Sequence, residues 1–148
     1  MRFYPLFFRA AFSWMDAERA HRIGFGAIRA VHTCGLGRLL ARYTAPSPSL
    51  RTEALGLVFP SPFGLAAGFD KEGRGIEALA ELGFGHIEVG TITGQAQPGN
   101  PQPRLFRLIE DRAVVNRMGF NNDGAAAVAP RIAAARAGPH EDSGGIWP

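Results

Sequence analysis

Two stretches in the middle of the chain decide the fold: residues 64–71 read Gly-Leu-Ala-Ala-Gly-Phe-Asp-Lys, and residues 83–91 read Gly-Phe-Gly-His-Ile-Glu-Val-Gly-Thr. Each contains a short apolar run, which ends at Ala67 in the first stretch and at Thr91 in the second. Residues 76–82, between them, have the spacing of a helix that ends at Gly83. A strand, a helix and a second strand in this order are typical of a β/α unit, so the sequence predicts parallel strands and an α/β fold.

The pattern on either side of this unit predicts helices before it and a hairpin and a helix after it. Asp16 has the character of an N-cap, with Glu18 in the first helical turn, and Gly35 is a natural stop for that helix. The other expected elements are helices over residues 3–14 and 38–43, a hairpin of 57–59 and 63–67 around Ser61 and Pro62, strands or hairpin arms at 104–108 and 113–116, and an alanine-rich helix within 124–137 that Pro130 starts or kinks. A Pro- and Ser-containing linker at 44–51 divides the chain into a helical segment, residues 1–51, and an α/β segment, residues 52–148.

The charged residues are unevenly distributed along the chain and unusual in type. Fifteen of the 16 basic residues are Arg, and the other is Lys71. Residues 1–51 hold eight Arg against two acids, whereas residues 52–148 hold seven Arg and Lys71 against eleven acids. The basic front segment fits either contact with an anionic lipid surface or ordinary solvated helix faces. Because the arginines are spread out and the body is acidic, we expect no nucleic-acid partner.

The cysteine count and the hydropathy pattern limit the classes of protein further. The single cysteine, Cys34, excludes an internal disulfide and a multi-cysteine metal site, and it fits a reducing compartment. We predict no metal site. No apolar run approaches the roughly 18–20 residues of a membrane-spanning helix, and Arg9 interrupts the apolar N-terminus, so a secretory signal is not expected.

Candidate functional residues follow the two predicted strands, because the loops at the carboxyl ends of parallel strands carry the sites of α/β folds. Gly68 lets a ligand approach the backbone, Lys71 offers a compact cation with three donors, and Thr91 offers a hydroxyl. A purely structural role is the alternative for Gly68 and Thr91. For Lys71 the alternative is a surface ion pair with Asp70 or Glu72.

A third cluster, residues 116–122, follows the strand at 113–115 and contains three asparagines. Their amides supply donors and acceptors together, which suits a planar polar ligand with alternating groups. Asparagine is also a favoured turn and cap residue, so a turn followed by the N-cap of the next helix explains the cluster equally well.

These blocks resemble the quinone-dependent (class 2) dihydroorotate dehydrogenases. The resemblance is carried by residues 64–71, 83–91, 97–101, 103–108 and 116–122, in the order and spacing of that family, and by Asp-Ala-Glu-Arg-Ala-His at 16–21. It extends over residues 1–137. It implies an α/β fold, in which a helical front segment precedes the first three or so β/α units of an FMN-bearing (β/α)8 TIM barrel. The implied reaction is the oxidation of (S)-dihydroorotate to orotate in pyrimidine (UMP) biosynthesis, with electrons passed to a membrane quinone.

The resemblance also assigns residues to ligands. It implies that Ala67, Gly68, Phe69, Asp70, Lys71 and Thr91 bind FMN. It implies that dihydroorotate contacts Lys71, Asn116, Arg117, Met118, Gly119 and Phe120, and that His21 and Arg107 lie near the quinone. A fixed ammonium near the pyrimidine end of the flavin stabilises the negative charge that develops there during hydride transfer. The asparagines orient the substrate rather than move a proton.

The length of the chain sets a further expectation. A barrel of this kind needs on the order of 200–250 residues, and the resemblance stops after Ala137. The serine base of class 2 enzymes lies beyond residue 148, so no catalytic base is assigned in this chain and Ser143 is given no role. We therefore expect a truncated or frame-shifted product, or a fragment, that is inactive on its own.

Two other interpretations remain open at this stage. The chain could be a non-catalytic membrane-associated fragment, or it could belong to another FMN-barrel oxidoreductase. The basic, Phe-rich front segment favours the quinone-dependent class, because such helices can lie in the membrane interface and bring a lipid-soluble quinone to the flavin. The expected location is peripheral, on the cytoplasmic side of the cell membrane.

Overall fold

The computed structural model describes residues 3–137, which begin with three helices: α1 (Phe3–Ala11), α2 (Ala17–Thr33) and α3 (Gly37–Thr44). Asp16 is the N-cap of α2, because its side chain accepts a hydrogen bond from the Arg19 backbone N–H at 2.8 Å. Gly35, with a φ of 76°, follows the end of α2. The predicted helices, the cap and the glycine stop are confirmed.

The first hairpin differs from the prediction. Strands β1 (Thr52–Ala54) and β2 (Leu57–Phe59) pair antiparallel around Leu55 and Gly56, not around Ser61 and Pro62. Both turn residues have positive φ, 54° and 73°, which suits the twist of a two-residue hairpin. The prediction was wrong because a leucine at a positive-φ position gives no turn signal. Ser61 is buried, and its hydroxyl accepts a hydrogen bond from the Phe63 backbone N–H instead.

The predicted β/α unit lies at the centre of the fold. Strands β3 (Gly64–Leu65) and β4 (His86–Ile87) pair in parallel, and α4 (Ile76–Ala80) connects them. Both strands are shorter than the apolar runs suggested. The parallel pairing and the connecting helix confirm the α/β class.

The last elements are the hairpin of β5 (Leu105–Leu108) and β6 (Ala113–Asn116), followed by α5 (Ala125–Ala137). The hairpin is confirmed. Pro130 does not start α5, because the helix already begins at Ala125, whose N–H donates to the Thr93 carbonyl at 2.8 Å. Pro130 therefore lies inside α5, where it leaves one helical hydrogen bond unmade.

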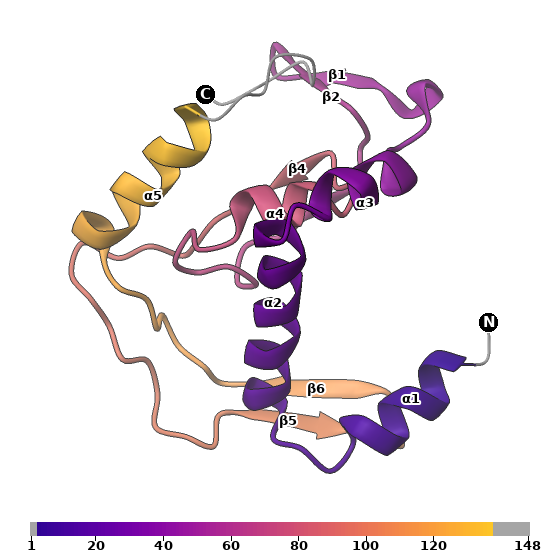
Figure 1. The fold of residues 1–148 in the computed structure, drawn as a ribbon. Coiled ribbons are helices and arrows are strands. Elements are labelled where there is room, and N and C mark those ends of the chain that lie inside the picture. Colours follow the sequence, from indigo (N-terminus) through magenta and orange to yellow (C-terminus); the bar gives the residue numbers. More distant parts are fainter. Residues whose placement is uncertain (1–2, 138–148) are drawn as a thin grey trace.

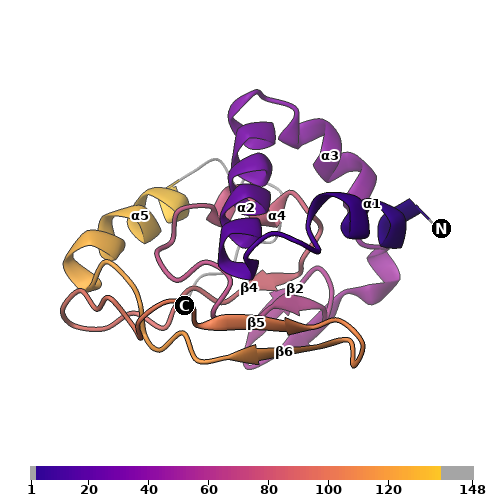
Figure 2. The ribbon, with the colours of Figure 1, turned by 90° about the horizontal axis from the view of Figure 1, so that it is seen from below.

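Helix α2 connects the two ends of the molecule. It begins against β5 and ends against α3 and α4, while α5 lies on the side away from α1 (Figures 1 and 2). The buried apolar side chains of the described part are Ala17, Ile76, Ala78, Leu79, Val128 and Ala135. Among residues 3–137, no helix is both long enough and apolar enough to cross a membrane.

Candidate functional site

Lys71 joins two of the loops that the sequence singled out. Its ammonium donates to the Gly119 carbonyl and to Asn121 Oδ1, each at 2.9 Å. Its two acceptors lie 48 and 50 residues further along the chain. The alternative of a surface pair with Asp70 or Glu72 is wrong, because those acids have other partners. An ammonium has three N–H groups, so one is left to meet a ligand.

Asp70 shapes the loop that carries Lys71. Its side chain is 2% exposed and accepts from the backbone N–H groups of Glu72, Arg74 and Gly75. Asp70 is therefore a loop-building residue, and its carboxylate faces its own backbone. Glu72, in turn, pairs with Arg74.

The ends of the two parallel strands are tied together by glycines. The Gly68 N–H donates to the Gly90 carbonyl at 2.8 Å, and the Gly90 N–H donates to the Asp70 carbonyl at 3.3 Å. Gly68 has a φ of 104°, and a Cβ placed there would meet no atom within 4 Å. The backbone conformation therefore requires glycine, while the space beside it is open. Ala67 and Thr91 are exposed on the same strand ends.

Lys71 is half-buried, and its surroundings alter its basicity. Burial lowers the pKa of Lys71 by disfavouring the charged form, and the positive charge of Arg104 lowers it further. The negative charge of Glu18 acts in the opposite direction. A group from α2 and another from the segment before β5 therefore act on the same ammonium.

The three asparagines of the third cluster have different roles. Asn116 is exposed and accepts from the Met118 N–H at 2.8 Å, which forms a turn. Asn122 is buried and accepts from the Gly124 N–H at 2.8 Å, next to the start of α5. Asn121 binds Lys71. The turn-and-cap interpretation thus holds for two asparagines, and Phe120 beside them is exposed and free to contact a ligand.

The other predicted substrate residues lie in the same segment. Arg117 donates to the Pro103 carbonyl at 2.9 Å, and its guanidinium lies over the Phe106 ring. The carbonyl groups of Met118 and Gly119 accept from Asn100 and Lys71. The segment is therefore held through its backbone, and Lys71 reaches its middle.

A buried ion pair beside this cluster was not foreseen from the sequence. Glu18 and Arg104 are 8% and 7% exposed, and two hydrogen bonds of 2.8 and 3.0 Å join them. Glu18 had been explained by the helix dipole alone. An acid in a first helical turn gives no signal of a partner 86 residues away.

The two predicted quinone residues connect the front helices to the rest of the fold. The His21 ring packs edge-on against Phe69 of the Lys71 loop, with ring centroids 4.6 Å apart. Arg107 donates to the carbonyls of Phe12 and Met15 at 2.9 and 2.7 Å, in the turn between α1 and α2. These contacts place His21 next to the candidate site and Arg107 under the end of α1.

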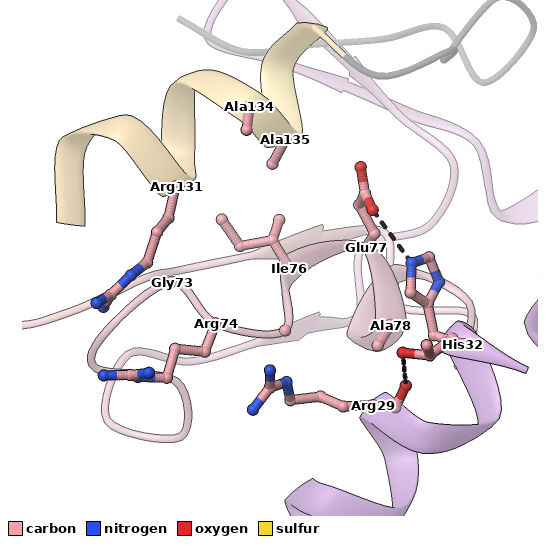
Figure 3. A pocket seen from close by; sticks show the side chains of 12 residues that line it. Arg29, His32, Gly73, Arg74, Ile76, Glu77, Ala78, Arg131, Ala134 and Ala135 are labelled. Carbon is pink, nitrogen blue, oxygen red and sulfur yellow. Dashed lines mark hydrogen bonds and ion pairs between the residues drawn. The ribbon is translucent and has the colours of Figure 1, made fainter. Parts of the chain in front are cut away.

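A cavity of about 440 Å³ lies elsewhere, between the end of α2, the start of α4 and α5 (Figure 3). Arg29, Arg74 and Arg131 line one side of it, and His32 with its partner Glu77 lines another. Arg74 and Arg131 both pair with Asp123, and Arg74 also pairs with Glu72, so the two arginines are balanced by two acids. The cavity contains none of the residues predicted to bind a ligand. Within residues 3–137, no three His, Cys, Asp or Glu side chains are grouped to hold a metal ion.

Comparisons with known proteins give one consistent answer. The family described as "Dihydroorotate dehydrogenase" matches residues 49–146. A dihydroorotate dehydrogenase (quinone) from Arthrobacter sp. (strain FB24) is 74% identical over the whole chain, which covers 42% of that relative. The corresponding protein of Thermobifida fusca is 55% identical over 90% of this chain and 36% of its own length. The chain thus spans about two fifths of the length of these curated relatives.

Solved structures agree with the sequence relatives. The crystal structure of a dihydroorotate dehydrogenase from Eimeria tenella in complex with ferulenol is 37% identical, with a TM-score of 0.67 over 90% of this chain and 33% of that one. The ligand-free form from the same organism gives a TM-score of 0.68, covering 89% of this chain and 35% of its own. Because the family match extends over more than half of the chain, and the parallel β3–β4 unit lies within it, the chain belongs to the dihydroorotate dehydrogenase family.

Proposed function

We propose that this chain carries the first part of the flavin and substrate site of a quinone-dependent dihydroorotate dehydrogenase. In the proposed reaction, (S)-dihydroorotate is oxidised to orotate in pyrimidine biosynthesis, and the electrons pass by way of FMN to a membrane quinone. The observation that carries the proposal is the position of Lys71. It bridges the loop after β3 and the segment after β6, the two segments to which the resemblance assigns flavin and substrate.

The strand ends suit a flat cofactor. Gly68 and Ala67 carry almost no side chain, and the open space beside Gly68 lets a planar ring approach the backbone. Phe69, Asp70 and Thr91 complete this flavin-binding set, in which Asp70 acts by shaping the loop. When bound, FMN supplies the hydride-accepting chemistry. Lys71 supplies a fixed positive charge, which stabilises the negative charge that grows on the accepting ring.

The substrate set is Asn116, Arg117, Met118, Gly119 and Phe120, with Lys71. The backbone bonds of this segment hold it in one place before a ligand arrives, so its amide and carbonyl groups can orient a ring without being ordered first. The Lys71 ammonium lies beside the Gly119 carbonyl and can meet the substrate and the flavin at once.

The test is FMN binding by the whole chain, measured by equilibrium dialysis. We expect little flavin to remain through purification and weak binding of added FMN. Lys71→Met, which keeps the length of the side chain and removes its charge, weakens that binding at least about tenfold, or about 1.4 kcal/mol. Arg136→Met, in the last turn of α5, is the matched control and leaves the affinity unchanged. Equal affinities of the Lys71 and Arg136 variants contradict the proposal.

The front helices are proposed to place the enzyme on the cytoplasmic face of the membrane and to bring the quinone to His21 and Arg107. Leu6 and Trp14 are 73% and 74% exposed, in and just after α1, in a segment rich in arginine. Exposed apolar side chains next to basic ones are typical of helices that lie in a lipid interface. The contact of His21 with Phe69 gives a short path from this segment to the flavin loop.

Sedimentation of the chain with anionic lipid vesicles tests this placement. Leu6→Glu should reduce the bound fraction several-fold, because it puts a charge into the lipid-facing surface. Leu55→Glu is the control: Leu55 is 94% exposed but lies in the β1–β2 turn. Equal losses in both variants would show that binding follows overall charge rather than α1.

A further inference from the structure

We propose that the buried Glu18–Arg104 ion pair positions the Lys71 ammonium, by fixing residues 98–100 against the segment that accepts the lysine's hydrogen bonds. Both are positioning residues, because they act on a ligand through Lys71. The inference rests on the proposed function only for the identity of the ligands that Lys71 would contact. The placement of Lys71 by the pair is a property of the chain itself.

The geometry of Arg104 leaves it little freedom. Its Nε and Nη2 donate to the two carboxylate oxygens of Glu18 at 3.0 and 2.8 Å, in the side-by-side arrangement that fits a guanidinium to a carboxylate. Its Nη1 donates to the carbonyls of Pro98 and Asn100 at 2.8 and 3.0 Å. One side chain thus fixes the start of α2 and the 98–100 loop together.

The 98–100 loop in turn holds the segment after β6. The Asn100 N–H donates to the Met118 carbonyl at 3.0 Å, and its side-chain amide donates to the Arg117 carbonyl at 2.6 Å. At Gly99, an added Cβ would lie 2.5 Å from the Met118 oxygen and 2.8 Å from Asn121 Cβ. The two segments are in such close contact that neither can shift without the other.

The next residues of that segment are the acceptors of Lys71. Gly119 follows Met118 directly, and Asn121 is the residue whose Cβ lies against Gly99. A path of hydrogen bonds, with the Met118–Gly119 peptide bond as one step, therefore runs from Glu18 through Arg104 and Asn100 to Lys71. Loss of the Arg104 side chain removes the bonds to the Pro98 and Asn100 carbonyls, so the 98–100 loop and the Lys71 acceptors packed against it can shift.

The charges of Arg104 and Glu18 shift the pKa of Lys71 in opposite directions, which makes their effects distinguishable by experiment. Arg104 lowers the pKa of Lys71 and Glu18 raises it, with burial as the larger cause. The loop of Lys71 itself carries two acids with other partners: Asp70, bound to backbone N–H groups, and Glu72, paired with Arg74. Removing Arg104 therefore raises the pKa of Lys71, and removing Glu18 lowers it. A general loosening of the fold would instead shift the pKa of Lys71 in the same direction in both variants.

The experiment uses the single lysine of the chain. Lysine labelled with ¹³C at Cε gives one lysine signal in the spectrum of the full chain, and its shift is followed against pH without flavin. Arg104→Gln is expected to raise the titration midpoint and to abolish the nuclear Overhauser contact between Lys71 and Asn121. Glu18→Gln is expected to lower the midpoint. Arg136→Gln, which removes an exposed guanidinium in the last turn of α5, is the control and leaves the signal unchanged.

Shifts of the same sign in the Glu18 and Arg104 variants, or an equal shift in the Arg136 control, overturn the inference. The double variant Glu18→Leu/Arg104→Met covers the case in which a single variant unfolds, because a buried ion pair can often be replaced by apolar side chains without loss of the fold. It removes the Arg104 guanidinium that donates to the carbonyls of Pro98 and Asn100. Persistence of the Lys71–Asn121 contact in that folded double variant also overturns the inference.

Adding FMN to the same samples separates this inference from the proposed function. If the variants move the Lys71 signal as expected but FMN leaves it unchanged, the positioning role stands and the flavin assignment fails. If FMN moves the signal of the parent chain but the variants do not, the flavin assignment stands and the positioning role fails.

Discussion

Lys71 shows what one residue type can do that its common substitute cannot. The chain uses arginine at 15 of its 16 basic positions, and Arg107 and Arg131 donate to backbone carbonyls far away in the sequence. The ammonium is a compact charge with three donors, whereas a guanidinium is a wide planar fork. Two of the three donors of Lys71 are used within the chain. For the proposed flavin site, we expect the compact ammonium to leave more room than a guanidinium for a flat ligand.

The role split between Lys71 and Arg107 gives a kinetic prediction. In a chimaera that joins this chain to the remaining part of the Arthrobacter relative, Lys71→Ala is expected to slow flavin reduction by dihydroorotate at least about a hundredfold, in the range of losses for one fixed electrostatic group. Arg107→Ala, under α1, is expected to leave that step nearly unchanged. Stopped-flow measurement of the reductive half-reaction checks this, and equal losses would refute it.

Glu18 gives a prediction about acid stability. Hydrogen bonds from Arg104 hold the pKa of Glu18 below its usual value, so the pair stabilises the fold above the unfolded glutamate pKa of about 4.3. This contribution is lost as the pH falls through the lower folded value. Glu18→Gln should lower the free energy of unfolding by about 3 kcal/mol at pH 7. It should also make that free energy less dependent on pH below about pH 5. Urea unfolding of the chimaera with the Arthrobacter relative, at several pH values, measures both effects. Glu53→Gln, on exposed β1, is the control, and an equally steep acid dependence in the Glu18 variant contradicts the prediction.

At the scale of elements, sequence reasoning succeeded where the signal was local. The cap at Asp16, the β5–β6 hairpin and the parallel β3–β4 unit all follow from spacing and from residue type. The β1–β2 turn could not be found, because its Leu55 adopts a positive φ that only the surrounding structure selects. The candidate site divides in the same way. Position after a strand is enough to single out Gly68, Lys71 and Thr91 as candidates, whereas the Glu18–Arg104 pair depends on a distant contact.

The proline inside α5 allows the effect of an interior proline on the free energy of unfolding to be measured. The helix runs on through Pro130, which is exposed, so replacing it adds a backbone donor without disturbing a core contact. In the chimaera with the Arthrobacter relative, Pro130→Ala is expected to raise the free energy of unfolding by about 1–2 kcal/mol, after allowance for the stiffer unfolded chain of the parent. Ala129→Gly, the neighbouring control, should lower it by about 1 kcal/mol. A lower stability of the Pro130 variant in urea would show that the proline shapes the helix usefully.

At the scale of the whole molecule, more large apolar side chains of the described residues are exposed than buried. The core of the described residues consists mainly of small side chains, with Ile76, Leu79 and Val128 as its larger members. Many large apolar side chains lie on the surface: Leu6, Phe7, Trp14, Ile109, Val114, Val115 and Phe120 are among them. Exposed apolar side chains in this number favour association.

We therefore expect the chain alone to self-associate and to melt without a sharp cooperative transition. Light scattering coupled to gel filtration, together with a thermal scan followed by circular dichroism, measures both properties. Val114→Glu, on the exposed strand β6, should shift the distribution towards smaller species. A monodisperse monomer with a steep melt would contradict this expectation.

The bonds of Arg107 have a consequence for how this region tolerates mutation. Arg107 binds the carbonyls of Phe12 and Met15, and these oxygens are present whatever side chains stand at positions 12 and 15. Substitution there leaves the connection intact, whereas insertion or deletion of one residue between α1 and α2 moves both acceptors out of reach. The constraint on this turn is its length rather than its composition. The front helix can therefore change its exposed residues freely while its attachment to β5 stays the same.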